Sequence, residues 1–220
     1  MLRGWSLSVR FLCNVYLIFM DAGLVMITPN LTPEMLLRAY SSGCFPWSGR
    51  PARWYCPDPR AVFEWDEIRF SRRLMRTVRQ ERYKVTFDQA FRQVITACSR
   101  LHTHSWIDSD IVEQYVALHR DGFAHSVEAW LDEELVGGLY GVQIRRMFAG
   151  ESMFHTRRDA SKVAFYHLVQ RLQELGVELF DAQVLNPHTC SLGATEIPRD
   201  VFLGRLRDAL AGPGDWAVDW

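Results

Sequence analysis

The spacing of apolar residues changes along the chain, and this change predicts helices first and strands afterwards. In the first half, apolar positions recur every three or four residues, the period of an amphipathic helix. From His125 the period falls to two, as in a half-buried strand. The expected helices are Glu34–Ser42, Ser71–Gln80, Asp88–Cys98, a segment capped by Asp108 or Ser109 that ends before Gly122, Asp159–Leu175 and Pro198–Leu210. The expected strands are His125–Leu131, Leu135–Gln143, Arg146–Phe154 and Val177–Val184.

Local signals fix several boundaries of these elements. Thr32 and Pro33 are a typical N-cap and first helical residue, and Gly43 is a typical stop. The segments Phe45–Trp47 and Trp54–Arg60 are too rich in proline for regular structure, so we expect ordered loops with exposed aromatic faces. The order of elements predicts an α+β fold with a mixed, mostly antiparallel sheet.

The N-terminal segment allows more than one interpretation. Phe11 to Met20 is a ten-residue run that Asn14 interrupts, with two arginines upstream, so it has the outline of a signal peptide. The run is too short to span a bilayer. A natural start at Met26, immediately before the first helix, is the favoured interpretation. It predicts that residues 1–25 are an extension outside the fold.

Composition and charge exclude few functions. The five cysteines are odd in number and lack zinc-ligand spacing, so we expect reduced thiols, a cytoplasmic protein and no metal site. The formal net charge is −1, so any contact with nucleic acid must come from a local basic patch. Arg72, Arg76 and Arg79 supply one, since they share a face of their helix. A solvated helix face is the alternative interpretation.

Three polar residues of the second half are candidates for chemistry. Glu151 stands among apolar residues, so a partly buried carboxylate is expected, either in a structural ion pair or in a functional site. Asp181 and Gln183 are two residues apart near a strand end and therefore face the same way. An exposed polar face of a strand would give the same pattern, so the residues alone leave both interpretations open.

Nine short strings, in the same order and spacing from about Thr32 to Leu206, resemble the bacterial leucyl/phenylalanyl-tRNA–protein transferases. They are Phe45-Pro46-Trp47, Trp54–Arg60, Ser105-Trp106-Ile107, Ala124–Glu128, Gly137–Gly141, Gly150–Phe154, Ala160-Ser161-Lys162, Asp181 with Gln183-Val184, and Ser191-Leu192-Gly193. One such string is weak, but nine in register make chance similarity implausible. Leu168 stands where the family often has an aromatic residue, which reshapes any pocket there.

The resemblance implies a small N-terminal domain, placed at residues 26–68, and a GNAT-like acyltransferase domain at 69–220. It implies catalytic roles for Asp181 and Gln183, and binding of the acceptor protein by Glu151 and Asp181. The pocket for the transferred side chain would be lined by Trp47, Trp106, Tyr115, Leu139, Phe148 and Leu168. The chain lacks the Arg/Gln-x-x-Gly-x-Gly/Ala turn with which acyl-CoA members of that fold bind pyrophosphate, which suits an RNA-borne donor and no cofactor.

The function implied by the resemblance is transfer of Leu, and also Phe or Met, from aminoacyl-tRNA to proteins that begin with Arg or Lys, which marks them for N-end-rule degradation. Partners would be charged tRNA, held through Arg72, Arg76 and Arg79, and the acceptor protein, with no membrane and no oligomer expected. Three alternatives are a peptidyltransferase of cell-wall cross-bridges, which is usually longer, an adaptor that binds basic N-termini without tRNA, and an ordinary CoA acetyltransferase.

Overall fold

The computed structural model describes residues 23–101, 106–212, 215–217 and 220. In chain order its elements are β1 (Leu24–Thr28), α2 (Pro33–Ser41), β2 (Phe45–Gly49), β3 (Ala52–Tyr55), β4 (Arg60–Phe63), α3 (Arg72–Arg79), β5 (Lys84–Phe87), α4 (Phe91–Leu101), α5 (Ser109–Arg120), β6 (Ala124–Leu131), β7 (Glu134–Ile144), β8 (Met147–His155), α6 (Ala160–Glu174), β9 (Leu179–Gln183), α7 (Pro187–Ser191), β10 (Ala194–Ile197) and α8 (Arg199–Ala211). The α+β class and the mixed, mostly antiparallel sheet are confirmed, since only β8 and β9 pair in parallel among the described strands.

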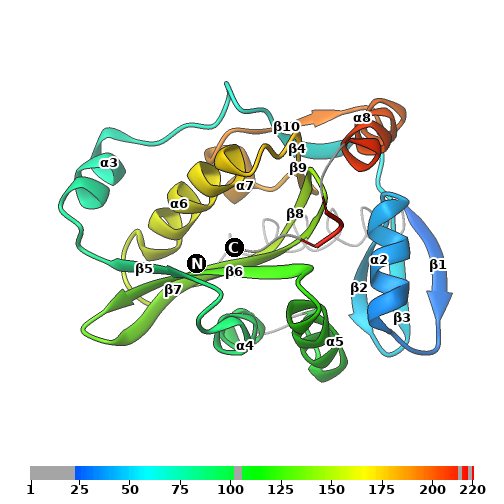
Figure 1. Ribbon diagram of the computed structural model, residues 1–220, viewed down its shortest axis with the longest axis horizontal. Helices are drawn as coiled ribbons and strands as arrows, with labels where there is room; N and C mark the ends of the chain where they lie inside the picture. The colour runs from blue at the N-terminus through cyan, green and yellow to red at the C-terminus, as the bar shows by residue number, and fades with distance from the viewer. Residues whose placement is uncertain (1–22, 102–105, 213–214, 218–219) are drawn as a thin grey trace, which may run out of the picture.

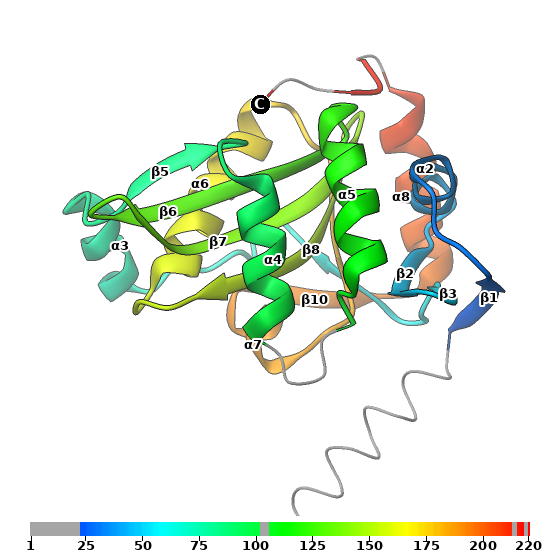
Figure 2. The same cartoon turned by 90° about the horizontal axis from the view of Figure 1, so that it is seen from below.

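The described strands form two sheets. The larger has the strand order β10-β4-β9-β8-β7-β6-β5, and the smaller has the order β1-β3-β2. Helix α6 covers one face of the larger sheet, while α4 and α5 lie against the other face (Figures 1 and 2). The core is divided accordingly. One cluster of buried side chains includes Tyr40, Tyr115 and Phe154, and a second includes Phe148, Phe165 and Leu168.

Most predicted helices are confirmed, and their caps explain why. The Thr32 side chain accepts a hydrogen bond from the Met35 N–H, and that of Asp108 accepts one from the Ile111 N–H. Helix α4 starts three residues later than the predicted Asp88. Asp88 instead adopts a positive φ of 59°, and its side chain accepts a hydrogen bond from the Ser126 N–H of β6.

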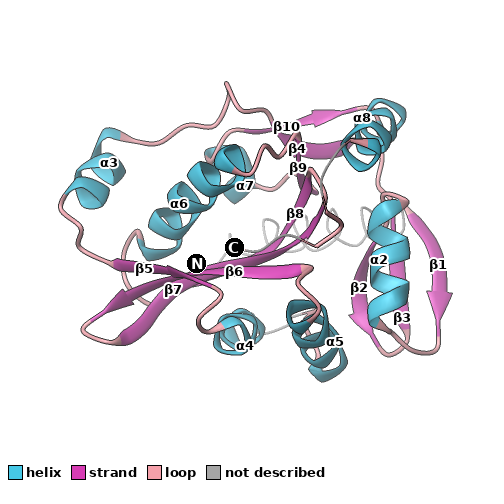
Figure 3. Cartoon of the chain, in the orientation of Figure 1, coloured by secondary structure: helices cyan, strands magenta, loops and turns pink. Residues whose placement is uncertain are grey.

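The prediction of loops in the proline-rich segments was wrong for Phe45–Trp47 and for the ends of Trp54–Arg60, and it is confirmed for residues 56–59. Phe45–Trp47 lie in β2, Trp54 and Tyr55 end β3, and Arg60 begins β4, which Figure 3 shows as strands. Pro46 is tolerated because β2 is an edge strand of its sheet, where a missing N–H need not break a ladder. Pro57 and Pro59 fall in the connection between β3 and β4. Proline content is thus a poor guide here, because strand pairing with distant segments decided the structure.

Two strands link residues on both sides of a predicted domain boundary. Strand β4 lies within the predicted 26–68 domain, yet it pairs with β9 and β10 in the larger sheet. Strand β1 starts at Leu24, so residues 24 and 25 of the predicted extension belong to a strand of the smaller sheet. Leu24 pairs with Tyr55 of β3, and Val25 lies at an irregularity of the register before Met26. Residues 1–22 lie outside the described part. No helix in the described part of the chain is long and apolar enough to cross a membrane.

Candidate active site

The parallel strands β8 and β9 separate in the middle of the larger sheet, and the polar candidates lie at this opening. Their pairing runs from Met147 opposite Leu179 to Ala149 opposite Asp181 and stops there. Opposite β7, Gly141 pairs with Gly150 and Tyr140 with Ser152, so Glu151 is the extra residue of a β-bulge. A bulge changes the direction of a side chain locally, and it turns Glu151 toward α2 and α5.

Three donors surround the Glu151 carboxylate. The Tyr40 hydroxyl donates to Oε1 at 2.6 Å, the Gln183 amide Nε2 donates to the same oxygen at 2.8 Å, and the Tyr115 hydroxyl lies 3.3 Å from Oε2. The two tyrosine hydroxyls are themselves 2.5 Å apart. No cationic side chain among the described residues pairs with Glu151. The site therefore contains an anion that is hydrogen-bonded but has no countercharge.

Burial dominates the electrostatics of this anion. Desolvation raises the pKa of Glu151 to about 7, and the nearby Asp181 charge adds to the rise, although hydrogen bonds from Tyr40 and Tyr115 oppose it. The same burial, together with the charge of Glu151, raises the pKa values of Tyr40 and Tyr115, which stay protonated donors. The buried Tyr140 hydroxyl has no hydrogen-bond partner among the described residues. The surroundings of Glu151 thus favour its neutralisation by an incoming cation.

Asp181 has a different environment, because a cation already neutralises it. Its Oδ1 accepts from Arg60 Nε at 2.8 Å and its Oδ2 accepts from Arg60 Nη2 at 2.5 Å, in a bidentate pair. Asp181 is 2% exposed and Arg60 is fully buried. Both carboxylate oxygens are occupied, so this geometry favours a positioning role for Asp181 over direct binding of a cationic acceptor.

Gln183 ends β9 in a strained turn that aims its side chain at Glu151. Its φ is +64°, and the Val184 N–H donates to the Ala182 carbonyl at 2.7 Å, which closes a three-residue turn. The Gln183 N–H donates to Asp181 Oδ1 at 2.8 Å. A non-glycine residue with this φ costs about 1–3 kcal/mol and persists only where its surroundings hold it. Such strain is concentrated at functional sites.

The six residues predicted to line the pocket lie in two groups. Trp47, Trp106 and Tyr115 belong to the cluster on the side of α2, α4 and α5, whereas Leu139, Phe148 and Leu168 belong to the cluster under α6. The second group is almost fully buried. Trp47 and Trp106 are partly exposed, and the Trp47 ring packs edge-on against Tyr55 at a centroid distance of 4.7 Å. Ser105 of the same motif lies outside the described residues.

The three arginines predicted to bind tRNA lie on α3, away from Glu151. Arg72, Arg76 and Arg79 are exposed, and none has an ion-pair partner among the described residues. Their neighbour Arg73 instead donates to Asp159, the residue before α6, at 3.0 Å. The helix therefore presents three uncompensated guanidinium groups to solvent.

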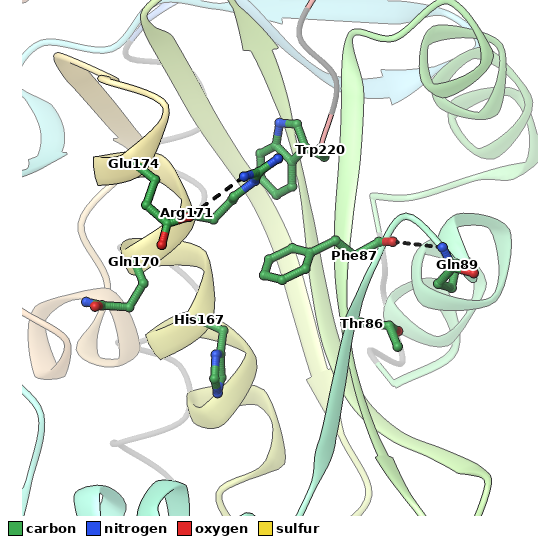
Figure 4. A pocket seen from close by; sticks show the side chains of 8 residues that line it. All are labelled: Thr86, Phe87, Gln89, His167, Gln170, Arg171, Glu174 and Trp220. Atoms are coloured by element: carbon green, nitrogen blue, oxygen red, sulfur yellow. Dashed lines mark hydrogen bonds and ion pairs between the residues drawn. The ribbon is translucent and has the colours of Figure 1, made fainter.

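A separate hollow of about 550 Å³ lies between α6 and β5. Thr86, Phe87 and Gln89 line one side, Trp220 lies beside Phe87, and His167, Gln170, Arg171 and Glu174 of α6 line the other (Figure 4). None of the predicted site residues lines this hollow. In the described part of the chain, no group of three His, Cys, Asp or Glu side chains is arranged to hold a metal ion.

Sequence reasoning missed two residues of the site. Tyr40 was assigned only to a helix, although it lies four residues after Leu36 on the buried face of α2. Arg60 was counted only as the end of an aromatic block. The available signal was chemical, since a buried Asp181 needs a cation, and the arginine of the Trp54–Arg60 string was a candidate in a part of the chain already tied to the site.

Comparison with known proteins shows the family of this chain. Residues 62–207 match the family model described as leucyl/phenylalanyl-tRNA protein transferase, and residues 29–58 match the model of its N-terminal domain. Proteins named leucyl/phenylalanyl-tRNA–protein transferase include one from Gloeobacter violaceus, 50% identical over 84% of this chain and 96% of its own, and one from Shewanella denitrificans, 48% identical over 84% of this chain and 80% of its own.

Among solved structures, a PaiA N-acetyltransferase from Thermoplasma acidophilum in complex with coenzyme A aligns over 43% of this chain and 75% of its own, with 13% identity and a TM-score of 0.32. That likeness is too weak to carry an argument. The match over both family models and the identity of about half the residues with curated members do carry one: this chain belongs to the leucyl/phenylalanyl-tRNA–protein transferase family.

Proposed function

We propose that this enzyme transfers Leu, and also Phe or Met, from aminoacyl-tRNA to the N-terminal Arg or Lys of acceptor proteins and so marks them for N-end-rule degradation. Family membership supports the coarser statement, that the chain is an aminoacyl-tRNA-dependent transferase acting on proteins. The finer assignment of acceptors and side chains rests on the site. We place the reaction in the cytoplasm, with the protein as a monomer and without a cofactor.

One observation carries the acceptor assignment: the uncompensated carboxylate of Glu151 at the opening between β8 and β9. It accepts hydrogen bonds from Tyr40 and Gln183 and has no cationic partner among the described residues. Burial without a countercharge is costly, and an acceptor that begins with Arg or Lys brings the missing cation. An N-terminal Ala brings none at its side chain. Selectivity for basic N-termini follows from this difference.

Gln183 is the group placed to direct the attacking amine. An ionised carboxylate only accepts hydrogen bonds, so the Gln183 Nε2 must face Glu151, and its Oε1 is left to accept from the α-amine. The free amine, with a pKa of about 8, is sufficiently neutral at cytosolic pH. Its nitrogen attacks the ester carbonyl, the C–N bond forms, the C–O bond to the terminal ribose breaks, and the ribose hydroxyl leaves with the proton that the amine loses. Alignment supplies much of the acceleration.

The transferred side chain is selected by an apolar pocket. We assign its wall to Leu139, Phe148 and Leu168, which are almost fully buried under α6; an apolar wall suits Leu, Phe and Met, and each methylene in such a site is worth about 1–3 kcal/mol. Trp47 and Trp106 on the other side of the sheet are partly exposed, so their rings are available to stack on a base of the tRNA 3′ end. Tyr115 lies beside Glu151, to which its hydroxyl donates a hydrogen bond at 3.3 Å.

The tRNA body is held by the exposed guanidinium groups of Arg72, Arg76 and Arg79. Because they lack anionic partners among the described residues, phosphates can bind them without first displacing a carboxylate. Arg73 on the same helix is engaged by Asp159 and serves as an internal contrast. This contact is independent of sequence, so it contributes affinity while the site near Glu151 selects the acceptor.

A transfer assay tests this function directly. The purified chain is incubated with radiolabelled Leu-tRNA and model peptides that begin with Arg, Lys or Ala. We expect label on the Arg and Lys peptides, none on the Ala peptide, and loss of transfer in Glu151→Ala. Binding of basic peptides without tRNA and without transfer would favour the adaptor and overturn the proposal. Transfer to all three peptides alike would refute the acceptor assignment alone.

A further inference from the structure

Arg60 is a buried cation whose every nitrogen is engaged. Besides its two bonds to Asp181, its Nη1 donates to the Gly43 carbonyl at 2.9 Å. The rings of Phe45 and Phe202 flank the guanidinium, with centroids 4.9 and 4.4 Å from Cζ. Five donors in a planar fork, with aromatic rings beside them, leave a single orientation for the group. No part of it reaches solvent, so it is unavailable to either substrate.

The hydrogen bonds of Arg60 connect it, through Asp181 and Gly43, to two residues that donate to Glu151. On one side, Asp181 Oδ1 receives Arg60 and also the Gln183 N–H, which holds the strained turn. On the other, Gly43 closes the end of α2, where its N–H donates to the Tyr40 carbonyl at 3.0 Å. Gln183 and Tyr40 are the two side chains that donate to Glu151 Oε1. One guanidinium therefore connects the supports of both.

The turn at Gln183 is where such support matters most. Strand β4 pairs Val62 with Asp181 and Ala61 with Gln183, so Ala182 is left over in an irregular register at this point. The strand ladder alone does not fix the direction of Gln183, whose φ of +64° is unfavourable for a side chain of its size. Besides the turn's own bond from Val184 to Ala182, the backbone of Gln183 is restrained by the bond from its N–H to Asp181, and Asp181 is itself held in place by the bidentate pair.

We propose that Arg60 is a positioning residue for the transfer step: through Asp181 and Gly43 it holds the Gln183 amide and the Tyr40 hydroxyl in register with the attacking amine. The proposal rests on the function given above. In this proposal the negative charge of Asp181 neutralises Arg60, and it does not bind the cationic acceptor. Displacement of a reacting group by about 1 Å costs about 100-fold in rate, so loss of this restraint reduces the rate constant of transfer with little effect on substrate binding.

Arg60→Lys tests the proposal, because lysine keeps the positive charge and lacks the planar guanidinium that makes the bidentate pair with Asp181. In single-turnover transfer of Leu to an Arg peptide at saturating substrates, we expect a fall of about 100-fold. The concentrations of tRNA and peptide that give half the maximal rate should stay within about twofold of wild type. Arg205→Lys is the matched control, since that arginine pairs with Glu64 at the surface, and its rate should not change. Wild-type rate in folded Arg60→Lys would overturn the proposal.

A double-mutant cycle separates positioning from general support of the fold. In a Gln183→Ala background, the direction of the amide no longer matters and only the support of Tyr40 through Gly43 is left, so Arg60→Lys should lower the rate by much less than about 100-fold. Additive losses would overturn the proposal. If Arg60→Lys fails to fold, Asp181→Asn replaces it in the same cycle, because asparagine keeps an oxygen for the Gln183 N–H and loses the charged pair. Wild-type protein that transfers nothing would instead refute the function itself.

Discussion

The opening between β8 and β9 and the surface of α3 both depend on arginine, in opposite surroundings. Arg60 is fully buried, and carboxylate oxygens and a carbonyl occupy its nitrogens. Arg72, Arg76 and Arg79 are exposed and have no ion-pair partner among the described residues. A buried, satisfied charge fixes the position of its neighbours, whereas an exposed, unpaired charge attracts a partner from solution. Arginine therefore positions neighbouring side chains in the first region, and it provides affinity for a binding partner in the second.

Removal of the Arg60 partner should give the largest effect. Asp181→Ala leaves a buried guanidinium without its countercharge, so we expect the free energy of unfolding to fall by about 3–5 kcal/mol. The Gln183 turn also loses its anchor, so transfer should fall to background. Urea unfolding and single-turnover transfer measure the two losses. The control is Glu64→Ala, which removes the exposed partner of Arg205 and should cost at most about 1 kcal/mol. Equal losses in the two variants would contradict the contrast between buried and exposed arginines.

The next effect concerns α3 and should appear in salt dependence. Changing Arg72, Arg76 and Arg79 together to Gln removes up to three phosphate contacts. The slope of log affinity for aminoacyl-tRNA against log salt concentration should become shallower by about 2–3. The transfer rate at saturating tRNA should not change. Arg92→Gln is the control, because Arg92 is paired with Glu113, and its slope should match that of wild type. An unchanged slope in the triple variant would remove α3 from the tRNA-binding surface.

Acceptor affinity should depend on pH through Glu151. Its pKa is raised to about 7, and only the ionised form attracts the acceptor's cation. Below pH 7 the carboxylate is mostly protonated, so affinity should weaken by up to about tenfold per pH unit as the pH falls. An N-acetylated Arg peptide, used as an inhibitor, avoids the titration of the α-amine. Glu151→Gln should show weak inhibition at every pH. A wild-type inhibition constant that is flat between pH 5 and 8 would contradict this role.

The smallest expected effect is a gain in stability from the same substitution. Because the folded-state pKa of Glu151 lies above its ordinary value, the fold favours the neutral form, and stability is lost as pH rises through about 7. The Glu151→Gln variant cannot ionise at this position, so its stability does not fall in this way as the pH rises. It should be more stable than wild type by about 1–3 kcal/mol at pH 8 and nearly equal at pH 4.5. Thermal unfolding at the two pH values tests the sign. Destabilisation at pH 8 would mean that a countercharge already compensates Glu151.

Much of the fold could be predicted from local pattern. Helix α2 follows from Thr32 and Pro33 at its start, and α6 from its apolar stripe and the stop at Gly176, whose φ is +68°. The strands β6, β7 and β8 follow from their period of two. By contrast, β2, β3 and β4 were missed, because their formation depends on pairing with residues elsewhere in the chain. Proline content misled the prediction, since an edge strand needs fewer N–H donors.

The chemistry of the site divides in the same way. Local sequence is sufficient to single out Glu151, Asp181 and Gln183, since a carboxylate in an apolar run and two polar residues on one strand face are visible without the fold. Their electrostatic environments, by contrast, depend on which distant side chains the fold brings to them. Arg60 comes to Asp181 from 121 positions away, while no described cation comes to Glu151. Charge compensation acts through space over a few ångströms, and sequence separation carries no information about that distance.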